Sequence, residues 1–147
     1  MIVAFTYNEE DVRLAFEHPR CMIGSDATAL APDGPLAGSS FHGAYTWASW
    51  FFRYFARERG ILSQEEAVRR LTALPAARLG LTDRGLLQPG MCADVAIFDP
   101  DVFAERGTTF EPNRTAGGMV HVLVNGKPVV ENGELTGNRS GQVLRRS

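Results

Sequence analysis

Cys21-Met22-Ile23-Gly24-Ser25-Asp26 is the stretch on which the predicted fold depends, because a short apolar run ends there on a hydroxyl and a carboxylate. Residues 21–24 predict a buried strand, and the apolar run at residues 2–6 predicts an earlier one. A helix capped by Asn8, running to Glu17 and ended by Pro19, is expected to join them. Apolar strands joined by a helix favour parallel pairing, so the opening of the chain predicts a βαβ unit.

Asp26 is the first candidate functional residue, because it follows a predicted strand and precedes a loop rich in Ala, Gly, Pro and Ser at residues 27–43. In parallel α/β folds, functional side chains project from this edge of the sheet. Asp26 is therefore a candidate catalytic or metal-facing carboxylate. The alternative is that Ser25 and Asp26 only satisfy backbone N–H groups of the loop.

Tyr7 and His42 are further candidates at the same edge. Tyr7 follows the first predicted strand, where it either lines a shared pocket with Asp26 or only packs. His42 lies in the loop after Asp26 and is a candidate ligand contact, although a surface histidine is the more common case. The other histidines, His18 and His121, are interpreted as structural. None of the three forms a close pair along a helix or strand, so no self-contained histidine metal site is predicted.

Residues 44–59 predict a helix with an unusually aromatic sequence. Its aromatic side chains occupy nearly every side, so it must be covered on several faces. A stacking platform for bases would need interleaved Lys and Arg, which cluster here only at the helix end, so core packing is favoured. Any part of this helix that the chain leaves uncovered predicts self-association through exposed apolar surface.

The remaining sequence predicts two short helices and then antiparallel strands. Ser63 with Glu66 forms a capping-box pattern, and the helix that it opens is expected to break at Leu74-Pro75. A further helical turn is expected to end at Gly80 in the left-handed cap position. Strands are predicted at residues 93–99, 120–124 and 128–131, and Asn125-Gly126 and Asn132-Gly133 favour tight turns after the last two.

Composition excludes several classes of protein. The chain has 147 residues, 15 basic against 17 acidic side chains and 44% hydrophobic residues, which is typical of a globular domain. A near-neutral charge without a basic stripe gives no footprint for nucleic acid. Cys21 and Cys92 form no CxxC pair, so a reduced, cytoplasmic chain is expected. No apolar run approaches the ~20 residues of a membrane span.

Several segments together carry a family resemblance. In chain order they are Asn8-Glu9-Glu10-Asp11-Val12 with His18-Pro19, Met22-Ile23-Gly24-Ser25-Asp26, Gly34-Pro35-Leu36, Leu62-Ser63-x-Glu65-Glu66-Ala67 with Leu74-Pro75-Ala76, Leu79-Gly80-Leu81-x-Asp83-Arg84-Gly85 with Pro89-Gly90-x-x-Ala93-Asp94, and Phe98-Asp99-Pro100 with Val122-x-Val124-Asn125-Gly126. The chain resembles the C-terminal part of a D-aminoacylase-type amidohydrolase, an N-acyl-D-amino-acid deacylase. The Pro-Gly-x-x-Ala-Asp segment is widespread among amidohydrolases, whereas Gly-Ser-Asp and Gly-Pro-Leu indicate the deacylase branch.

The resemblance implies an α/β plus β fold. Residues 1–79 are expected to be the C-terminal strands and helices of a (β/α)8 barrel, and residues 80–147 part of a small β-sandwich with the C-terminal tail. Asp26 matches the family's general base, which takes a proton from zinc-bound water and returns one to the leaving amine. Asp26 is also a candidate metal ligand, and Tyr7, Ser25 and His42 are candidate contacts of a small N-acyl amino acid substrate.

One departure from the family limits what the chain is expected to do. The family's His-x-His pair and its metal-ligating Cys and His residues have no counterpart, and a complete barrel takes ~250 residues. The barrel is therefore expected to be incomplete, to bind no zinc tightly and to be inactive alone. The alternative is a non-catalytic binding or assembly module that self-associates or docks on a chain carrying the metal ligands. The segment Ser40-Phe41-His42-Gly43-Ala44-Tyr45, where related enzymes often have an arginine, leaves the acyl and amino-acid specificity open.

Overall fold

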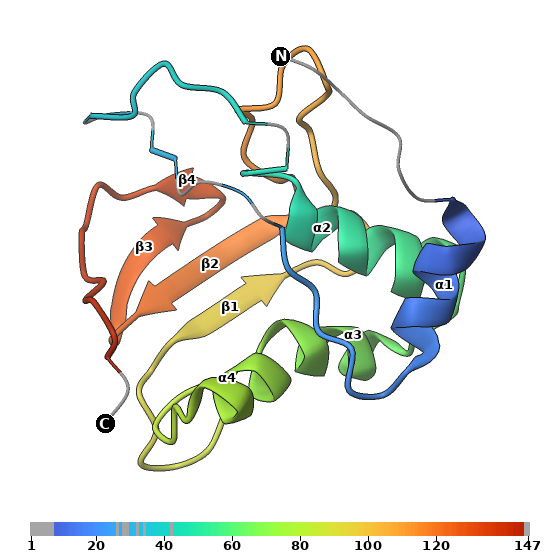
Figure 1. The fold of residues 1–147 in the computed structure, drawn as a ribbon. Helices are drawn as coiled ribbons and strands as arrows, with labels where there is room; N and C mark the ends of the chain where they lie inside the picture. The colour runs from blue at the N-terminus through green and yellow to red at the C-terminus, as the bar shows by residue number, and fades with distance from the viewer. Residues whose placement is uncertain are drawn as a thin grey trace.

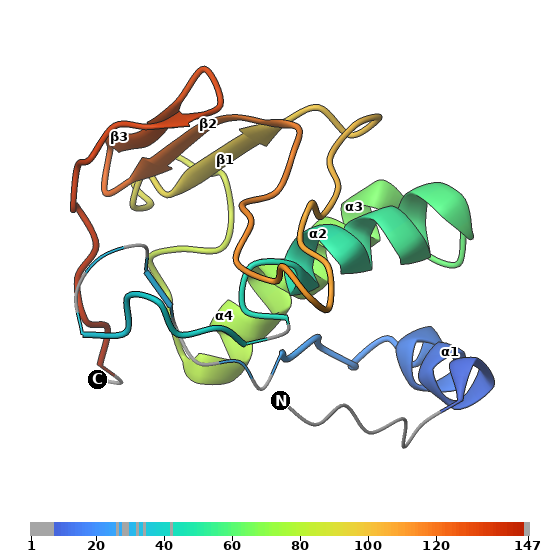
Figure 2. The ribbon, with the colours of Figure 1, turned by 90° about the horizontal axis from the view of Figure 1, so that it is seen from above.

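Helices occupy the first half of the chain and an antiparallel sheet the second, in a computed structural model that describes residues 8–25, 27, 30–31, 33, 35–41 and 43–145. The sheet lies to one side of the helices (Figures 1 and 2). The elements are α1 (Glu9–Glu17), α2 (Trp47–Phe51), the π-helix η1 (Phe52–Glu58), α3 (Gln64–Leu71), α4 (Ala73–Leu79), β1 (Val95–Phe98), β2 (Met119–Val124), β3 (Lys127–Glu131) and β4 (Glu134–Leu135).

The first helix forms as the sequence predicts. The Asn8 side chain accepts a hydrogen bond from the Asp11 backbone N–H at 2.8 Å, which satisfies one of the free donors of the first turn of α1. Helix α1 ends at Glu17, and His18 before Pro19 is its C-cap. The predicted Asn8 cap and the helix end before Pro19 are both confirmed.

The prediction of a strand at residues 21–24 is wrong. A strand needs a neighbour for its N–H and C=O groups, and residues 21–25 pair with no strand in the described chain. The Cys21 N–H instead donates to the His18 carbonyl at 3.0 Å, which closes a turn after α1. The strand expected at residues 2–6 lies outside the described residues, and the described sheet is antiparallel, so these residues give no support to the predicted βαβ unit.

The aromatic helix is shorter than predicted and changes its type. It begins at Trp47 rather than Ala44 and continues from α2 into η1, where the Arg59 N–H donates to the Tyr54 carbonyl five residues earlier at 3.0 Å. Phe51, Phe52 and Phe55 are the largest fully buried side chains of the structure. The interpretation of this helix as a core element is therefore confirmed.

The buried rings connect elements that are far apart in the sequence. Phe16 of α1 lies with its ring centroid 5.0 Å from that of Phe51 and 4.8 Å from that of Phe55. On the other side, the Phe52 centroid is 5.2 Å from that of Phe98 in β1 and 5.8 Å from that of Phe103. Tilted and edge-on contacts at these separations are favourable for aromatic pairs. One aromatic core thus holds both the first helix and the sheet.

Helices α3 and α4 follow the predicted order but divide earlier. The Ser63 side chain accepts from the Glu66 N–H at 3.1 Å, as expected of an N-cap. The break between the two helices falls at Thr72, because Pro75 fits within the first turn of α4, where its missing N–H costs no hydrogen bond. Gly80 ends α4 with φ of 74°, the left-handed cap that the sequence predicts.

The sheet has the strand order β1-β2-β3-β4 with antiparallel neighbours throughout. Both Asn-Gly pairs adopt positive φ, 50° and 76° at Asn125 and Gly126 and 52° and 81° at Asn132 and Gly133. Asn and Gly tolerate this conformation best, and it matches the twist of a tight hairpin. The predicted antiparallel β unit is confirmed.

Phe55→Ala should lower the free energy of unfolding by about 3–5 kcal/mol, because it leaves a cavity between α1 and η1. Phe110→Ala is the matched control, since Phe110 is 94% exposed and its loss should change stability by less than about 0.5 kcal/mol. Urea denaturation followed by circular dichroism measures both. Equal effects of the two substitutions would contradict the assignment of the core.

Candidate functional site

The segment around the predicted catalytic residue is described only in part. The Ser25 hydroxyl accepts a hydrogen bond from the Ala27 N–H at 3.1 Å, a local turn contact of the kind expected from a capping role. Asp26, Tyr7 and His42 lie outside the described residues. The grouping of these residues with Ser25 around a substrate therefore stays a prediction.

A buried arginine holds the chain that leads into this segment. Arg70 of α3 is 2% exposed, and its guanidinium donates to Glu66 Oε1 at 2.7 Å, to the Phe16 carbonyl at 2.6 Å and to the Cys21 carbonyl at 3.4 Å. Arg69 donates to the Pro19 carbonyl at 2.9 Å. The residues from the end of α1 to Cys21 are thus tied to α3 through their backbone.

Sequence reasoning missed this cluster. It assigned Glu66 to the capping box, whereas the Glu66 carboxylate accepts from Arg69 at 2.6 Å and 2.8 Å and from Arg70 at 2.7 Å. The spacings Glu66 to Arg69 and Glu66 to Arg70, three and four residues on a helix, were the signal that could have found it. The hydrogen bond from Arg69, and after it that from Arg70, lowers the pKa of Glu66 to about 2 despite partial burial.

His18 and His121 have structural partners, as expected from the sequence. His18 Nδ1 accepts from the Arg20 N–H at 3.2 Å, next to the end of α1. His121 Nδ1 lies 3.4 Å from the Asn132 N–H, between β2 and the turn after β3. Each imidazole therefore supports a local turn.

A second polar cluster gives a structural role to Asp94, the last residue of the Pro-Gly-x-x-Ala-Asp segment. Arg84 donates to Asp94 Oδ2 at 2.5 Å, while Asp94 Oδ1 accepts from the Asn125 N–H at 2.7 Å. Asp94 thereby fastens the start of β1 to the turn between β2 and β3. The Cys92 thiol donates to Asp83 at 3.2 Å, and this bond raises the pKa of Cys92. A raised pKa keeps the thiol protonated and unreactive, so this cluster has the chemistry of a structural tie.

Zinc is the metal that the family resemblance implies, and the described part of the chain does not fit it. Within the described ranges, no three His, Cys, Asp or Glu side chains come together as a metal site would require. A zinc site takes at least three protein ligands in close, tetrahedral arrangement. The donors that these residues bring together serve ion pairs and turns instead.

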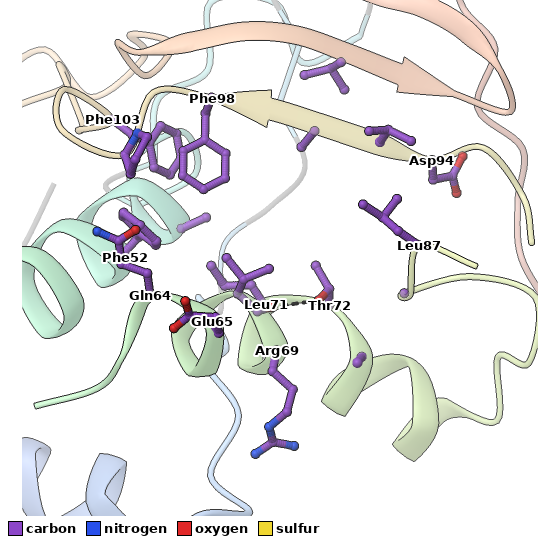
Figure 3. Close-up of a pocket in the computed structure, with 18 of the residues that line it drawn as sticks. Phe52, Gln64, Glu65, Arg69, Leu71, Thr72, Leu87, Asp94, Phe98 and Phe103 are labelled. Carbon is purple, nitrogen blue, oxygen red and sulfur yellow. Dashed lines mark hydrogen bonds between the residues drawn. The ribbon is translucent and has the colours of Figure 1, made fainter. Parts of the chain in front are cut away.

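An apolar groove of about 950 Å³ lies between α3 and β1 (Figure 3). Phe52, Phe98 and Phe103 form one end of it, and Leu87 and Asp94 lie toward the other. Leu87 is 79% exposed although it is a large apolar side chain. Grooves of this size and lining are typical of surfaces that another molecule or chain segment covers.

Comparison with known proteins shows which family this chain belongs to. Residues 6–130 match the sequence profile of the Amidohydrolase family. The chain belongs to the amidohydrolase family. It is 38% identical over 144 residues to the N-acyl-D-glutamate deacylase of Alcaligenes xylosoxydans xylosoxydans, an alignment that covers 98% of this chain.

Two solved structures share the fold of this amidohydrolase chain. A D-aminoacylase structure matches 95% of it with a TM-score of 0.81 and 34% identity. The N-acyl-D-glutamate deacylase of Bordetella bronchiseptica, solved with zinc and a phosphonate inhibitor, matches 95% of it with a TM-score of 0.76 and 39% identity. The chain spans 28% of the length of each of these structures and 28% of the Alcaligenes relative.

These matches confirm the family that the sequence motifs indicate. The expected fold is confirmed at the level of a D-aminoacylase-like segment that includes a small antiparallel sheet. In the part of the chain that the structure covers, no helix has the length and apolar character to cross a membrane.

Glu66→Gln should remove a stabilisation that depends on pH. The folded-state pKa of Glu66 is about 2 against an ordinary value of 4.5, so its contribution is complete above about pH 4.5 and is lost as pH falls toward 2. The difference in the free energy of unfolding between the native chain and Glu66→Gln, measured by urea titration, should be constant near neutral pH and shrink below about pH 4. An equal difference at about pH 3 and about pH 6 would contradict the Glu66 ion pairs.

Proposed function

We propose that this chain is the Asp26-bearing portion of a metal-dependent amidohydrolase that hydrolyses the amide C–N bond of N-acyl-D-amino acids. The observation that carries the proposal is the match to N-acyl-D-glutamate deacylase over 98% of the chain, at 38% identity. Because nearly the whole chain matches one part of a deacylase in sequence and in fold, it is best explained as the corresponding part of such an enzyme.

Two portions of the chain correspond to two parts of the proposed enzyme. Residues 1–79 belong to the end of a catalytic barrel, and residues 80–147 to a small β-sandwich with its tail. In support, the described helices lie between Glu9 and Leu79, and the described strands lie between Val95 and Leu135. The two portions share the aromatic core, so they fold against each other.

Asp26 carries the proposed chemistry. Hydrolysis of an N-acyl amino acid adds water across the amide and yields a carboxylic acid and a free amino acid. As general base, the Asp26 carboxylate takes a proton from the attacking water, and it then gives a proton to the leaving nitrogen, so it ends each turnover unchanged. Tyr7, Ser25 and His42 are the proposed substrate contacts.

The metal site is proposed to lie elsewhere in the complete enzyme. The His, Cys, Asp and Glu side chains of the described residues do not assemble a zinc site. We therefore expect the 147-residue chain to need the metal-binding portion of a deacylase for activity.

Asp26→Asn should lower kcat by about 10²–10⁴-fold, because the side-chain amide of asparagine cannot take the proton of the attacking water. The assay uses a chimera in which this chain replaces the segment that it matches in the Alcaligenes N-acyl-D-glutamate deacylase, with N-acyl-D-glutamate as substrate. Asp33→Asn, an exposed aspartate on the same loop, is the matched control and should keep the activity of the chimera. An Asp26→Asn chimera as active as the unsubstituted one would contradict the assignment.

A non-catalytic assembly module is the second candidate, and the apolar groove favours it. Leu87 at the groove and Leu79 at the end of α4 are 79% and 61% exposed. Exposed apolar surface of this kind is typical of a face that a second protein covers.

If the chain is such a module, light scattering at micromolar concentration should show a dimer or larger species. Leu87→Glu should then shift it toward the monomer, because a carboxylate in an apolar interface is costly to desolvate. Glu134→Gln in the exposed β4 is the control and should leave the mass unchanged. A monodisperse monomer of the native chain would remove the support for this candidate.

A further inference from the structure

Arg70 is the only charged side chain that is buried among the described residues, and burial of a charge is costly unless its donors are paired. Its partners are the carboxylate of Glu66 and two backbone carbonyls, those of Phe16 and Cys21. The Phe16 carbonyl belongs to the last turn of α1, where helix carbonyls lack partners within the helix. Arg70 therefore reaches across from α3 to the end of α1 and beyond it.

Arg69 makes the same connection from the outer side. Its side chain is 39% exposed, and its guanidinium donates both to Glu66 and to the Pro19 carbonyl. The two arginines share the Glu66 carboxylate, whose Oε1 accepts from both. Phe16, Pro19 and Cys21 thus present three carbonyls of one turn to a single ion-pair cluster on α3.

Two local hydrogen bonds to His18, from the Arg20 N–H and the Cys21 N–H, shape the turn but do not tie it to another element. Side chains at residues 17–20 are exposed, whereas Phe16 before the turn and Ile23 after it pack against the aromatic core. Side-chain packing therefore fixes the two ends of the stretch, and the backbone contacts with α3 fix the path between them. Only two residues separate Ile23 from Asp26 in the sequence.

We propose that Glu66, Arg69 and Arg70 form a carbonyl clamp that positions the Asp26-bearing segment for catalysis. This inference rests on the proposed function, because it assigns the clamp to the deacylase reaction. The three are positioning residues, since they act through the backbone of residues 16–21. Arginine is required at position 70, because a planar guanidinium presents several N–H donors in fixed directions and a lysine ammonium does not.

Hydrogen exchange on the chain itself tests the clamp independently of activity. The Cys21 N–H, which donates to His18 within the clamped turn, should exchange at least about tenfold faster in Arg69→Met and in Arg70→Lys. Amides of β2 should keep their rates. Arg78→Met, at an exposed position on α4, is the matched control and should alter neither set. Arg69→Met retains the buried Arg70, so it reports on the clamp even if Arg70→Lys does not fold.

Activity in the deacylase chimera tests the positioning role. Arg69→Met should lower kcat by about tenfold to a hundredfold with KM unchanged, because a displaced base still permits substrate binding. Arg70→Lys should also lower kcat, although lysine keeps the positive charge.

Three results would overturn the clamp: unchanged exchange at Cys21 in the folded variants, a uniform increase in exchange over the whole chain, or a loss of activity that appears in KM. A fully active Asp26→Asn chimera would instead overturn the proposed function. In that case, faster exchange confined to the Cys21 N–H would still show that the clamp holds the turn in place, but the clamp would have no role in catalysis.

Discussion

Burial of the three phenylalanines Phe51, Phe52 and Phe55 is the constraint on which the rest of this structure depends. Each ring removes on the order of 150–250 Å² of surface from water, which makes these side chains a dominant source of stability. Phe16 brings α1 to one side of the cluster, and Phe98 brings β1 to the other. Without this core, the helices and the sheet would share few contacts, so the same rings that stabilise the fold also place its two portions together.

Clusters of charged side chains hold segments that the aromatic core does not contact directly. Asp94 pairs with Arg84 and accepts from the Asn125 N–H, which joins the start of β1 to the β2–β3 turn. Arg70 pairs with Glu66 and donates to the Phe16 and Cys21 carbonyls, which joins α3 to the chain after α1. An ion pair with a buried member, such as Arg70 with Glu66, adds little net stability, but removing one partner is costly, which makes it well suited to fixing geometry. Asp94, the last residue of the Pro-Gly-x-x-Ala-Asp segment, thereby has a structural role in this chain.

Local rules predicted much of the fold. The caps at Asn8 and Ser63, the left-handed Gly80 and the two Asn-Gly turns follow from interactions within a few residues, and all of them are confirmed. The strand expected at residues 21–24 failed because strand formation depends on a distant partner that local sequence does not specify. The helix break moved to Thr72 because proline is tolerated in a first turn, a choice that depends on where the previous helix ends.

For the candidate site, the sequence predicted the family but not all of the residues that shape the site. The motif around Asp26 indicated the family, and the comparisons confirm it, whereas the roles of Asp26, Tyr7 and His42 concern residues outside the described ranges. Arg70 was missed because its burial depends on carbonyls of residues 16 and 21, about fifty positions away. A charged residue on an amphipathic helix is ordinarily solvated, so sequence alone gives no reason to expect it inside.

The central claim is that this chain supplies a catalytic carboxylate to an amidohydrolase whose metal is held elsewhere. The most direct measurement is hydrolysis of N-acyl-D-glutamate by the purified chain alone, with and without added zinc, beside the complete Alcaligenes deacylase as reference. The account predicts no zinc-dependent turnover by the isolated chain. Zinc-dependent turnover by the 147 residues alone, abolished by a chelator and restored by zinc, would contradict it.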